Sequence, residues 1–399
     1  MTDYRTLKIK TGTLTVFGGI KRDPLIRALT DLLDRVCEDD IDTYAAVEAY
    51  SRFAEILLEQ TEDLSEYIRR AVLRDENFYV KKIAAGEEPG KELNETVKRE
   101  LAVLSEIASL SSKALSEKIM PSGLPQWRNS RLKLTEEFSG KLANISSTGY
   151  GMYAEHTFFR VEDGNILPVT HPDYQPLSML FGYSRERELI VRNTEALVEG
   201  RGASNMLLYG DMGTGKSSTI KAVAAEYSDR GLRIVEIKKN QLYQIPDIME
   251  ELASNPLRFI LFIDDLSFSG NDDNFSALKA TLEGSISGCG DNTVIYATSN
   301  RRHLVKENFS DRDGDELHVN DTLQETMSLA ARFGLTITFQ KPGKDDYLDI
   351  VRALAEEYGI AGDYTEEELF RRAEAFAIRK NGRSPRTARQ FVELLKIGI

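Results

Sequence analysis

The sequence predicts an α/β protein: a doubly wound parallel sheet preceded by a mostly helical N-terminal domain and followed by a helical segment. Five short apolar runs between residues 206 and 339 alternate with stretches of helical periodicity, which is typical of buried parallel strands joined by helices. Apolar stripes at helical spacing fill residues 1–118. From about residue 343 the helical periodicity returns. These three observations define the predicted architecture.

Composition limits the class of protein further. The chain has 399 residues, of which 41% are hydrophobic, and a formal net charge of −13. It is long enough for about two to three domains. Its cysteines are Cys37 and Cys289 alone, so we expect no disulfide framework and a reducing compartment. No apolar run approaches the roughly 20 residues of a membrane span, and no signal-peptide pattern opens the chain, so we expect a cytoplasmic protein.

The acidic charge argues against a broad nucleic-acid-binding surface, because a polyanion repels a protein of the same sign. One local exception is a group of cations near the C-terminus. Its members are Arg379, Lys380, Arg383, Arg386 and Arg389.

The N-terminal helices are predicted one by one from stripes and breaks. Asp23 and Pro24 are a helix cap and a first helical residue, and apolar residues follow at helical spacing to Val36. Further stripes cover residues 43–60 and 64–72, and one more follows the break at residues 86–90. We interpret these stripes as the core of a helical domain, with docking of a partner protein as the alternative.

The composition of residues 119–176 differs from that of the helical stripes before them, because glycine and proline are frequent. Apolar residues 156–161 and 166–169 flank Asp163, Gly164 and Asn165, which predicts a β-hairpin. We interpret this segment as a connecting subdomain between the helical domain and the sheet.

A phosphate-binding motif follows the first apolar run of the sheet, residues 206–209. The pattern is Walker A in full, and a helix is predicted directly after it. Glycines let backbone N–H groups turn towards phosphates, and the helix N-terminus adds positive potential. We expect Lys216 to reach the β- and γ-phosphates of ATP and Ser217 to ligate Mg²⁺. The nucleotide-binding residues predicted here are Gly210, Asp211, Met212, Gly213, Thr214, Gly215, Lys216, Ser217 and Ser218.

Two acids end another buried run, residues 259–263. Asp264 and Asp265 therefore lie at the carboxyl end of a strand, where open α/β sheets bind ligands. We expect Asp264 to hold Mg²⁺ and Asp265 to polarise the water that attacks the nucleotide.

With these motifs the chain from about Leu177 to its end resembles the AAA+ ATPases. The segments 208–218, 263–268 and 296–304 look like those of a bacterial AAA+ family classified as a domain of unknown function. The resemblance implies an α/β nucleotide-binding domain over residues 177–342 and a helical lid over residues 343–399. It also implies that the protein assembles into a homo-oligomer.

The resemblance further implies roles for single residues. Asn300 matches sensor 1, which positions the attacking water. Arg332 matches the arginine finger supplied to a neighbouring subunit, with three rival candidates: Arg301, Arg302 and Arg312.

On the lid, Arg386 matches sensor 2, which touches the γ-phosphate, and Arg389 one turn along is its alternative. Phe181 and Tyr183 occupy the place where this class lays an apolar side chain against adenine.

Two features depart from the family pattern. Most AAA+ enzymes have Glu at the position of Asp265, and the Asp-Asp ending is similar to that of replication initiators and helicase loaders. The stretch 238–243 lacks the aromatic–aliphatic–glycine loop of substrate-threading unfoldases, so we interpret Tyr243 as a core or interface residue rather than a pore residue.

The predicted function is an AAA+ ATPase that hydrolyses ATP with Mg²⁺ to drive assembly or remodelling of a protein or nucleoprotein partner, which the N-terminal helices would recognise. Two alternatives stay open: a DNA-associated ATPase like a helicase loader, and an ATP-binding scaffold with little turnover.

Overall fold

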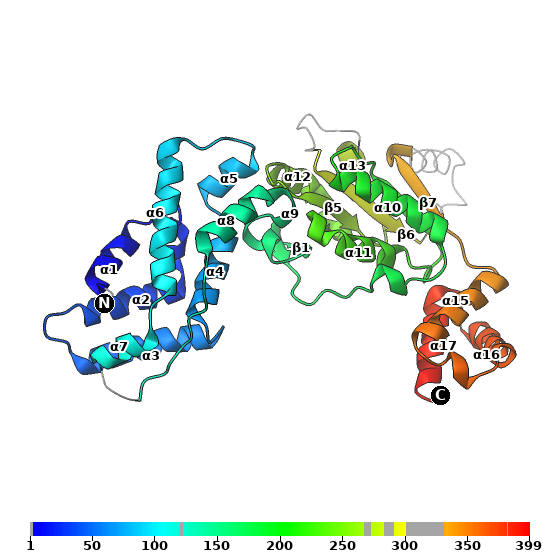
Figure 1. Ribbon diagram of the computed structural model, residues 1–399. Helices are drawn as coiled ribbons and strands as arrows, with labels where there is room; N and C mark the ends of the chain where they lie inside the picture. Colours follow the sequence, from blue (N-terminus) through cyan, green and yellow to red (C-terminus); the bar gives the residue numbers. More distant parts are fainter. Residues whose placement is uncertain (1–2, 120–122, 267–272, 283–290, 301–330, 381) are drawn as a thin grey trace. The chain divides into compact units, whose positions relative to one another are not determined.

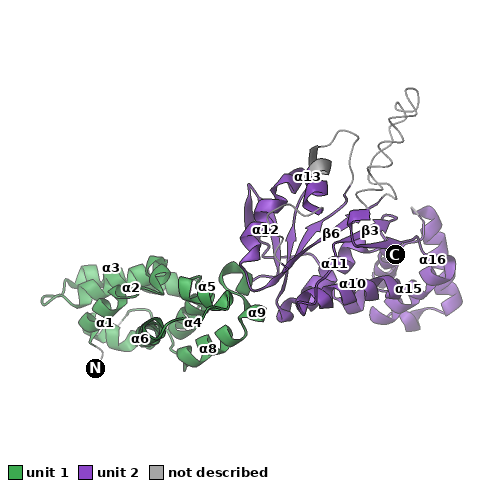
Figure 2. Cartoon of the chain, turned by 90° about the horizontal axis from the view of Figure 1, so that it is seen from above, with its two compact units in different colours: residues 1–155 green, residues 156–399 purple. Residues whose placement is uncertain are grey.

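The computed structural model describes residues 3–119, 123–266, 273–282, 291–300, 331–380 and 382–399. It divides into two compact units, residues 1–155 (unit 1) and residues 156–399 (unit 2), coloured separately in Figure 2. The segment predicted to connect the domains is shared between them, since residues 119–155 belong to unit 1 and residues 156–176 to unit 2. The four domain boundaries stay a prediction, because contacts within units do not test which parts fold independently.

Unit 1 is helical, which confirms the predicted helical N-terminal region (Figure 1). Its second helix begins as the sequence indicates, since the Asp23 carboxylate accepts a hydrogen bond of 2.9 Å from the Leu25 N–H and Pro24 is the first helical residue. The helices are α1 (Tyr4–Gly12), α2 (Pro24–Val36), α3 (Thr43–Leu58), α4 (Leu64–Arg74), α5 (Phe78–Ala84), α6 (Lys91–Ala108), α7 (Ser112–Ile119), α8 (Leu134–Ala143) and α9 (Ile145–Thr148), with 3-10 turns η1 (Gly18–Arg22) and η2 (Gly151–Ala154).

Trp127 lies in the core of unit 1, although the sequence around it shows no helical pattern. Its ring centroid is 5.3 Å from that of Tyr50 and 5.0 Å from that of Phe53. Its indole N–H donates to the carbonyl of Leu110 at 2.9 Å. The loop after α7 is therefore anchored by one large buried side chain whose polar atom is satisfied.

Unit 2 contains a seven-stranded sheet in the order β2-β1-β4-β5-β6-β3-β7. Every neighbouring pair is parallel except the β1–β2 hairpin, so the predicted α/β fold with a mainly parallel sheet is confirmed. The predicted hairpin thus extends the same sheet that carries the phosphate-binding motif. The strands are β1 (Phe158–Glu162), β2 (Asn165–Pro168), β3 (Met206–Gly210), β4 (Leu232–Glu236), β5 (Arg258–Ile263), β6 (Thr293–Ser299) and β7 (Leu335–Phe339).

Helices cover both faces of this sheet. On one face lie α10 (Ser184–Val198) and α11 (Lys216–Glu226), as Figure 1 shows. Their side chains share a buried cluster with those of β3, β5 and β6. On the other, α12 (Ile245–Ala253) contacts β6 and α13 (Asp273–Leu282). Strand residues of the opposite parity, such as Leu207 and Leu261, are buried as well. A sheet buried on both faces explains why its strands are continuous apolar runs.

The C-terminal helices of unit 2, which we call the lid, follow the sheet. They are α15 (Lys344–Glu357), α16 (Glu366–Arg379) and α17 (Pro385–Lys396), and they enclose a separate apolar cluster. Short 3-10 turns complete unit 2: η3 (Leu177–Met179), η4 (Ser228–Arg230), η5 (Lys239–Gln244) and η7 (Ala361–Asp363). The side chain of Tyr243 in η5 is 62% exposed, so it is not a core residue.

Candidate functional site

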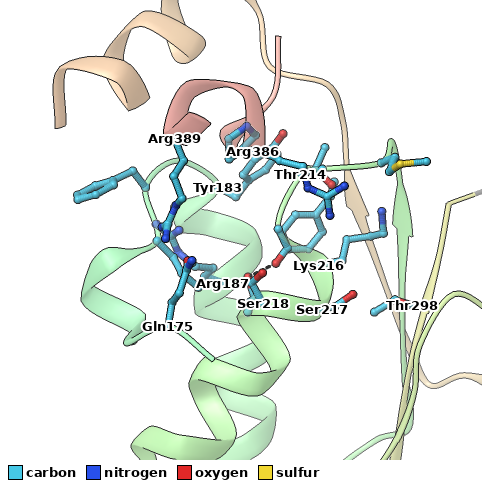
Figure 3. Close-up of a pocket in the computed structure, with 18 of the residues that line it drawn as sticks. Gln175, Tyr183, Arg187, Thr214, Lys216, Ser217, Ser218, Thr298, Arg386 and Arg389 are labelled. Carbon is cyan, nitrogen blue, oxygen red and sulfur yellow. Dashed lines mark hydrogen bonds between the residues drawn. The ribbon is translucent and has the colours of Figure 1, made fainter. Parts of the chain in front are cut away.

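A pocket of about 390 Å³ lies in unit 2, bounded by the loop after β3, the carboxyl ends of β5 and β6, the start of α10, and the lid (Figure 3). That volume is in the range of small-molecule sites. Most of the residues that the sequence nominates line it: Phe181, Tyr183, Met212, Gly213, Thr214, Gly215, Lys216, Ser217, Ser218, Asp264, Asp265, Asn300, Arg386 and Arg389.

The loop Gly210–Gly215, which we call the P-loop, needs its glycines for geometric reasons. Gly210 has φ +140°, and a Cβ there would overlap the backbone carbonyl of Phe339 in β7. Gly213 and Gly215 have φ of +82° and +94°, in the region that side chains disfavour. Gly215 is also the cap of α11, so the loop delivers the chain into a helix N-terminus. The P-loop is therefore shaped as an anion cradle.

Lys216 is the buried cation of the pocket, with 5% of its surface exposed. Its ammonium donates to the carbonyls of Gly210 and Asp211 at 2.8 and 2.9 Å and to the Asn300 side-chain oxygen at 3.0 Å. Burial lowers the pKa of Lys216, while the nearby Asp211, Asp264 and Asp265 carboxylates oppose that effect. An anionic ligand would compensate this buried charge.

Asp264 is placed against the start of α11. Its Oδ1 accepts hydrogen bonds of 2.6 Å from the Ser217 hydroxyl and 2.6 Å from the Thr298 hydroxyl of β6. Since β5 and β3 are separated by β6 in the sheet, the contact between Asp264 and Ser217 spans two strand positions. Two oxygen ligands of the kind that Mg²⁺ prefers thus lie side by side.

Asp265 adopts an unusual backbone conformation with φ +51°, rare for a residue with a side chain. Its N–H donates to the Thr298 hydroxyl at 3.0 Å. Its carboxylate accepts a hydrogen bond of 2.6 Å from the Asn300 amide. Asn300 therefore bridges Asp265 and Lys216, which are carried by different strands and loops.

One end of the pocket is apolar. Phe181 and Tyr183 line it from the segment before α10, and Ile350 and Leu354 line it from α15 of the lid. The Tyr183 hydroxyl donates to the carbonyl of Gln340 at 2.5 Å, and burial raises the pKa of this phenol. This end suits the flat apolar faces of a nucleobase.

The lid touches the P-loop directly. The backbone N–H of Arg386, in the first turn of α17, donates to the carbonyl of Gly213 at 3.2 Å. Ser384 caps α17 by accepting from the Thr387 N–H at 3.1 Å, which fixes where this turn begins. Arg389 donates to the carbonyl of Met179 at 3.0 Å and so ties the lid to the segment before α10.

The predicted arginine finger lies elsewhere. Arg332 precedes β7 and does not line the pocket in the part of the chain that the structure describes. The rival fingers Arg301, Arg302 and Arg312, like Cys289, lie outside the described residues.

Sequence reasoning missed several lining residues, among them Thr298, Gln175 and Arg187. Thr298 holds both acids, yet it has the character of an ordinary β-branched strand residue. Gln175 lies in a segment without periodicity. Arg187 lies one helical turn after Tyr183, and that spacing is the signal that could have found it.

The fold and the site together define the class of protein. A mainly parallel sheet with β6 between β3 and β5, a P-loop leading into α11, and a helical lid that meets the P-loop make up an AAA+-like ATPase fold, which implies nucleotide binding.

The family follows from comparison with known proteins. The chain belongs to the family described as "Protein of unknown function (DUF815)", whose model matches residues 154–398. That range begins beside the start of unit 2, so the family is defined by the sheet, the pocket and the lid. No curated protein matches the chain.

Among solved structures, a mutant of RuvB from Thermogota maritima is similar at 16% sequence identity, with a TM-score of 0.36. The match covers 55% of this chain and 63% of that one, less than two thirds of its length. A similarity of this size carries no information about activity.

Within the residues that the structure describes, no helix combines the length and the apolar character that crossing a membrane requires.

Proposed function

We propose that this protein binds ATP with Mg²⁺, hydrolyses the ATP, and uses the turnover to assemble or remodel a protein or nucleoprotein partner. The observation that carries the proposal is the position of Asn300, which accepts from Lys216 at 3.0 Å and donates to Asp265 at 2.6 Å. One amide thus joins the phosphate-binding cation to the candidate water-activating acid. Such a link would hold the cation and the acid in fixed positions around the phosphates. Positioning and charge provide most of the catalysis in phosphoryl transfer.

Each of the other residues has a matching role. Lys216 and the P-loop N–H groups would hold the phosphates, while Asp265 would polarise the attacking water. Arg386 enters the pocket from the lid, and its side chain makes no hydrogen bond or ion pair within the described residues, so it is available for a phosphate oxygen.

The residues present suit a magnesium ion. Ser217 and Asp264 offer a hydroxyl and a carboxylate oxygen 2.6 Å apart beside the P-loop, and Mg²⁺ prefers such oxygen ligands. These two residues would hold the ion, directly or through its water shell. When bound, Mg²⁺ neutralises charge on the phosphates.

Assembly into a homo-oligomer is part of the same proposal. Arg332 does not line the pocket of its own chain. An arginine in this position would act on the pocket of a neighbouring subunit, where a finger of this kind is worth roughly 10³–10⁵ in rate.

The C-terminal cations support this function over the DNA-associated alternative. Arg383 forms an ion pair within the lid, since its guanidinium donates to the Glu374 carboxylate at 2.8 and 2.7 Å. Arg386 and Arg389 line the pocket. Of the predicted cluster, Arg379 and Lys380 therefore remain to contact a nucleic acid. Two cations on a chain with a net charge of −13 are few for binding a polyanion.

The experiment is a comparison of ATP binding and turnover in the purified full-length chain. With Mg²⁺ present, Asp265→Asn should keep ATP affinity but lower the hydrolysis rate by roughly 10²–10⁴, the usual contribution of a general base. The matched control is Asp247→Asn on the exposed start of α12, which should leave both quantities unchanged. Binding without turnover in the wild type would favour the scaffold alternative, and absence of ATP binding in calorimetry would refute the proposal.

A further inference from the structure

Arg187 enters the pocket from α10, a helix that the phosphate-binding motif does not include. Its backbone N–H donates to the carbonyl of Tyr183 at 2.9 Å, and Tyr183 is the residue that precedes α10, so Arg187 lies in the first turns of the helix beside the segment that carries Tyr183. Both line the pocket, and Figure 3 shows the Arg187 side chain among the labelled lining residues. The start of α10, directly after Tyr183, therefore contributes a cation to the pocket.

This cation has no acidic partner. Within the part of the chain that the structure describes, the Arg187 side chain makes no hydrogen bond or ion pair, although it is half-buried. Burial lowers the pKa of Arg187, and the neighbouring Glu186 carboxylate opposes that effect. By contrast Arg192, further along α10, is exposed and pairs with Glu188 at 2.5 Å. A half-buried guanidinium without a carboxylate is costly unless an anion binds it.

The position of Arg187 along the pocket selects which part of a nucleotide it can meet. The catalytic end of the pocket is marked by Asp264, Asp265 and Asn300, at the carboxyl ends of β5 and β6. The apolar end is marked by Phe181 and Tyr183. Arg187 comes from the element of the apolar end, and α10 packs against α11, whose first turn carries the lining residue Ser218. A nucleotide with its base at the apolar end would have its α-phosphate between these two elements.

We propose that Arg187 binds the α-phosphate of the nucleotide. The inference rests on the proposed function, because it requires a nucleotide in the pocket. The cations of the site then have separate roles. Lys216 and Arg386 serve the β- and γ-phosphates, which AMP lacks, whereas Arg187 serves the phosphate that AMP, ADP and ATP share. Arg187 thus sets affinity without sensing the hydrolysis state.

The test measures the Kd values of the full-length protein for ATP, ADP and AMP by calorimetry with Mg²⁺. Arg187→Ala should raise all three by a common factor of about 10–100, as expected for a charge-assisted hydrogen bond. Arg187→Lys should recover part of the loss. The matched control is Arg185→Ala, an exposed arginine in the same first turn that does not line this pocket. It should leave every Kd within twofold.

A second readout separates binding from folding. Alanine and arginine have similar helix propensities, and the variant no longer buries an unpaired guanidinium, so the melting temperature without nucleotide should not fall. If Arg187→Ala lowers the melting temperature, the test passes to Arg187→Lys. That variant should raise the Kd values for ATP, ADP and AMP by one common factor, smaller than the factor expected for alanine. Unchanged Kd values for AMP, or a loss confined to ATP, would overturn the assignment while leaving the proposed function intact. A wild type that binds no adenine nucleotide would overturn both.

Discussion

Lys141 in unit 1 and Lys216 in unit 2 have similar hydrogen bonds and similarly shifted pKa values but different surroundings. Both donate to backbone carbonyls, Lys141 to Leu73 near the end of α4 and Lys216 to the P-loop. Burial lowers the pKa of both, that of Lys141 to about 8. A perturbed lysine is therefore not by itself the mark of a functional site.

The surroundings of the two lysines differ. Lys216 lies among glycines with positive φ, two aspartates and an asparagine, at the wall of a pocket. Lys141 packs inside a helical unit, where its carbonyl partner ends a helix. Under the proposed function, access for a ligand, rather than burial of the charge, distinguishes Lys216 from Lys141. The following predictions test that distinction, and the expected effects of the first three decrease in order.

Removing the ammonium group should abolish most ATP turnover at Lys216 but leave turnover nearly unchanged at Lys141. Lys216→Met should lower ATP turnover at least about a thousandfold, close to 4 kcal/mol of barrier, because the phosphates lose their buried cation. Lys141→Met should leave turnover within twofold of the wild type. A steady-state ATPase assay of the two variants checks this, and loss of turnover in Lys141→Met would contradict the comparison.

A buried acid in unit 1 offers the second test. Glu100 in α6 is 4% exposed, and its carboxylate accepts from the N–H groups of Thr15, Val16 and Phe17 at 2.7, 3.2 and 2.9 Å. Glu100→Ala should lower the free energy of unfolding of unit 1 by about 3 kcal/mol, because these buried donors lose their acceptor.

Urea unfolding followed by the fluorescence of Trp127 measures this effect, since the chain has one tryptophan and it lies in the core of unit 1. The control is Glu95→Ala, an exposed residue of α6 paired with Lys98, which should change stability by no more than about 0.5 kcal/mol. Lost ATP binding in Glu100→Ala at temperatures where unit 1 stays folded would show that the acid is more than structural.

Two glycines close to the two lysines provide the third test. Gly213 has φ +82°, and a Cβ there would lie 3.2 Å from the Ser384 hydroxyl and 3.3 Å from the Arg386 Cβ. Gly213→Ala should cost about 1–2 kcal/mol of stability and weaken ATP binding, because it strains the P-loop and pushes the lid away.

Gly140, next to Lys141, is inside α8 and has no atom within 4 Å of a Cβ built there. Gly140→Ala should stabilise unit 1 by about 0.5–1 kcal/mol. Thermal unfolding with and without ATP compares the pair, and equal effects of the two substitutions would argue against a lid closed on the P-loop.

The last prediction concerns the pH dependence of stability. The pKa of Lys141 is lowered to about 8 in the folded state from an ordinary 10.5, so the unfolded chain binds more protons between these values. The stability of unit 1 should therefore rise as pH increases from about 8 to 10.5. Lys141→Met should remove this contribution, and Trp127 fluorescence in urea at several pH values measures it. If the stability of Lys141→Met still rises with pH over this range, another group causes the pH dependence.

Much of the fold could be predicted from the sequence because its signals are local. Asp23 and Pro24 start α2 as expected, and the strand β7 has the predicted bounds Leu335–Phe339. By contrast α8 was not predicted, because its stripe is short and contains Gly140. The place of the β1–β2 hairpin in the main sheet was not predicted either, since pairing of β1 with β4 joins residues more than 70 positions apart.

The sequence by itself determined the phosphate-binding loop, the two acids and the alternation of strands and helices, because each of these is written in consecutive residues. The tertiary structure alone added Arg187 to the arginines that line the pocket and set Arg383 apart from them. Arg383 pairs with Glu374, whereas Arg187 lines the pocket from α10 and Arg386 lines it from the lid. Their roles depend on how α10 and the lid pack around the P-loop, and no local pattern encodes a contact between segments some 200 residues apart.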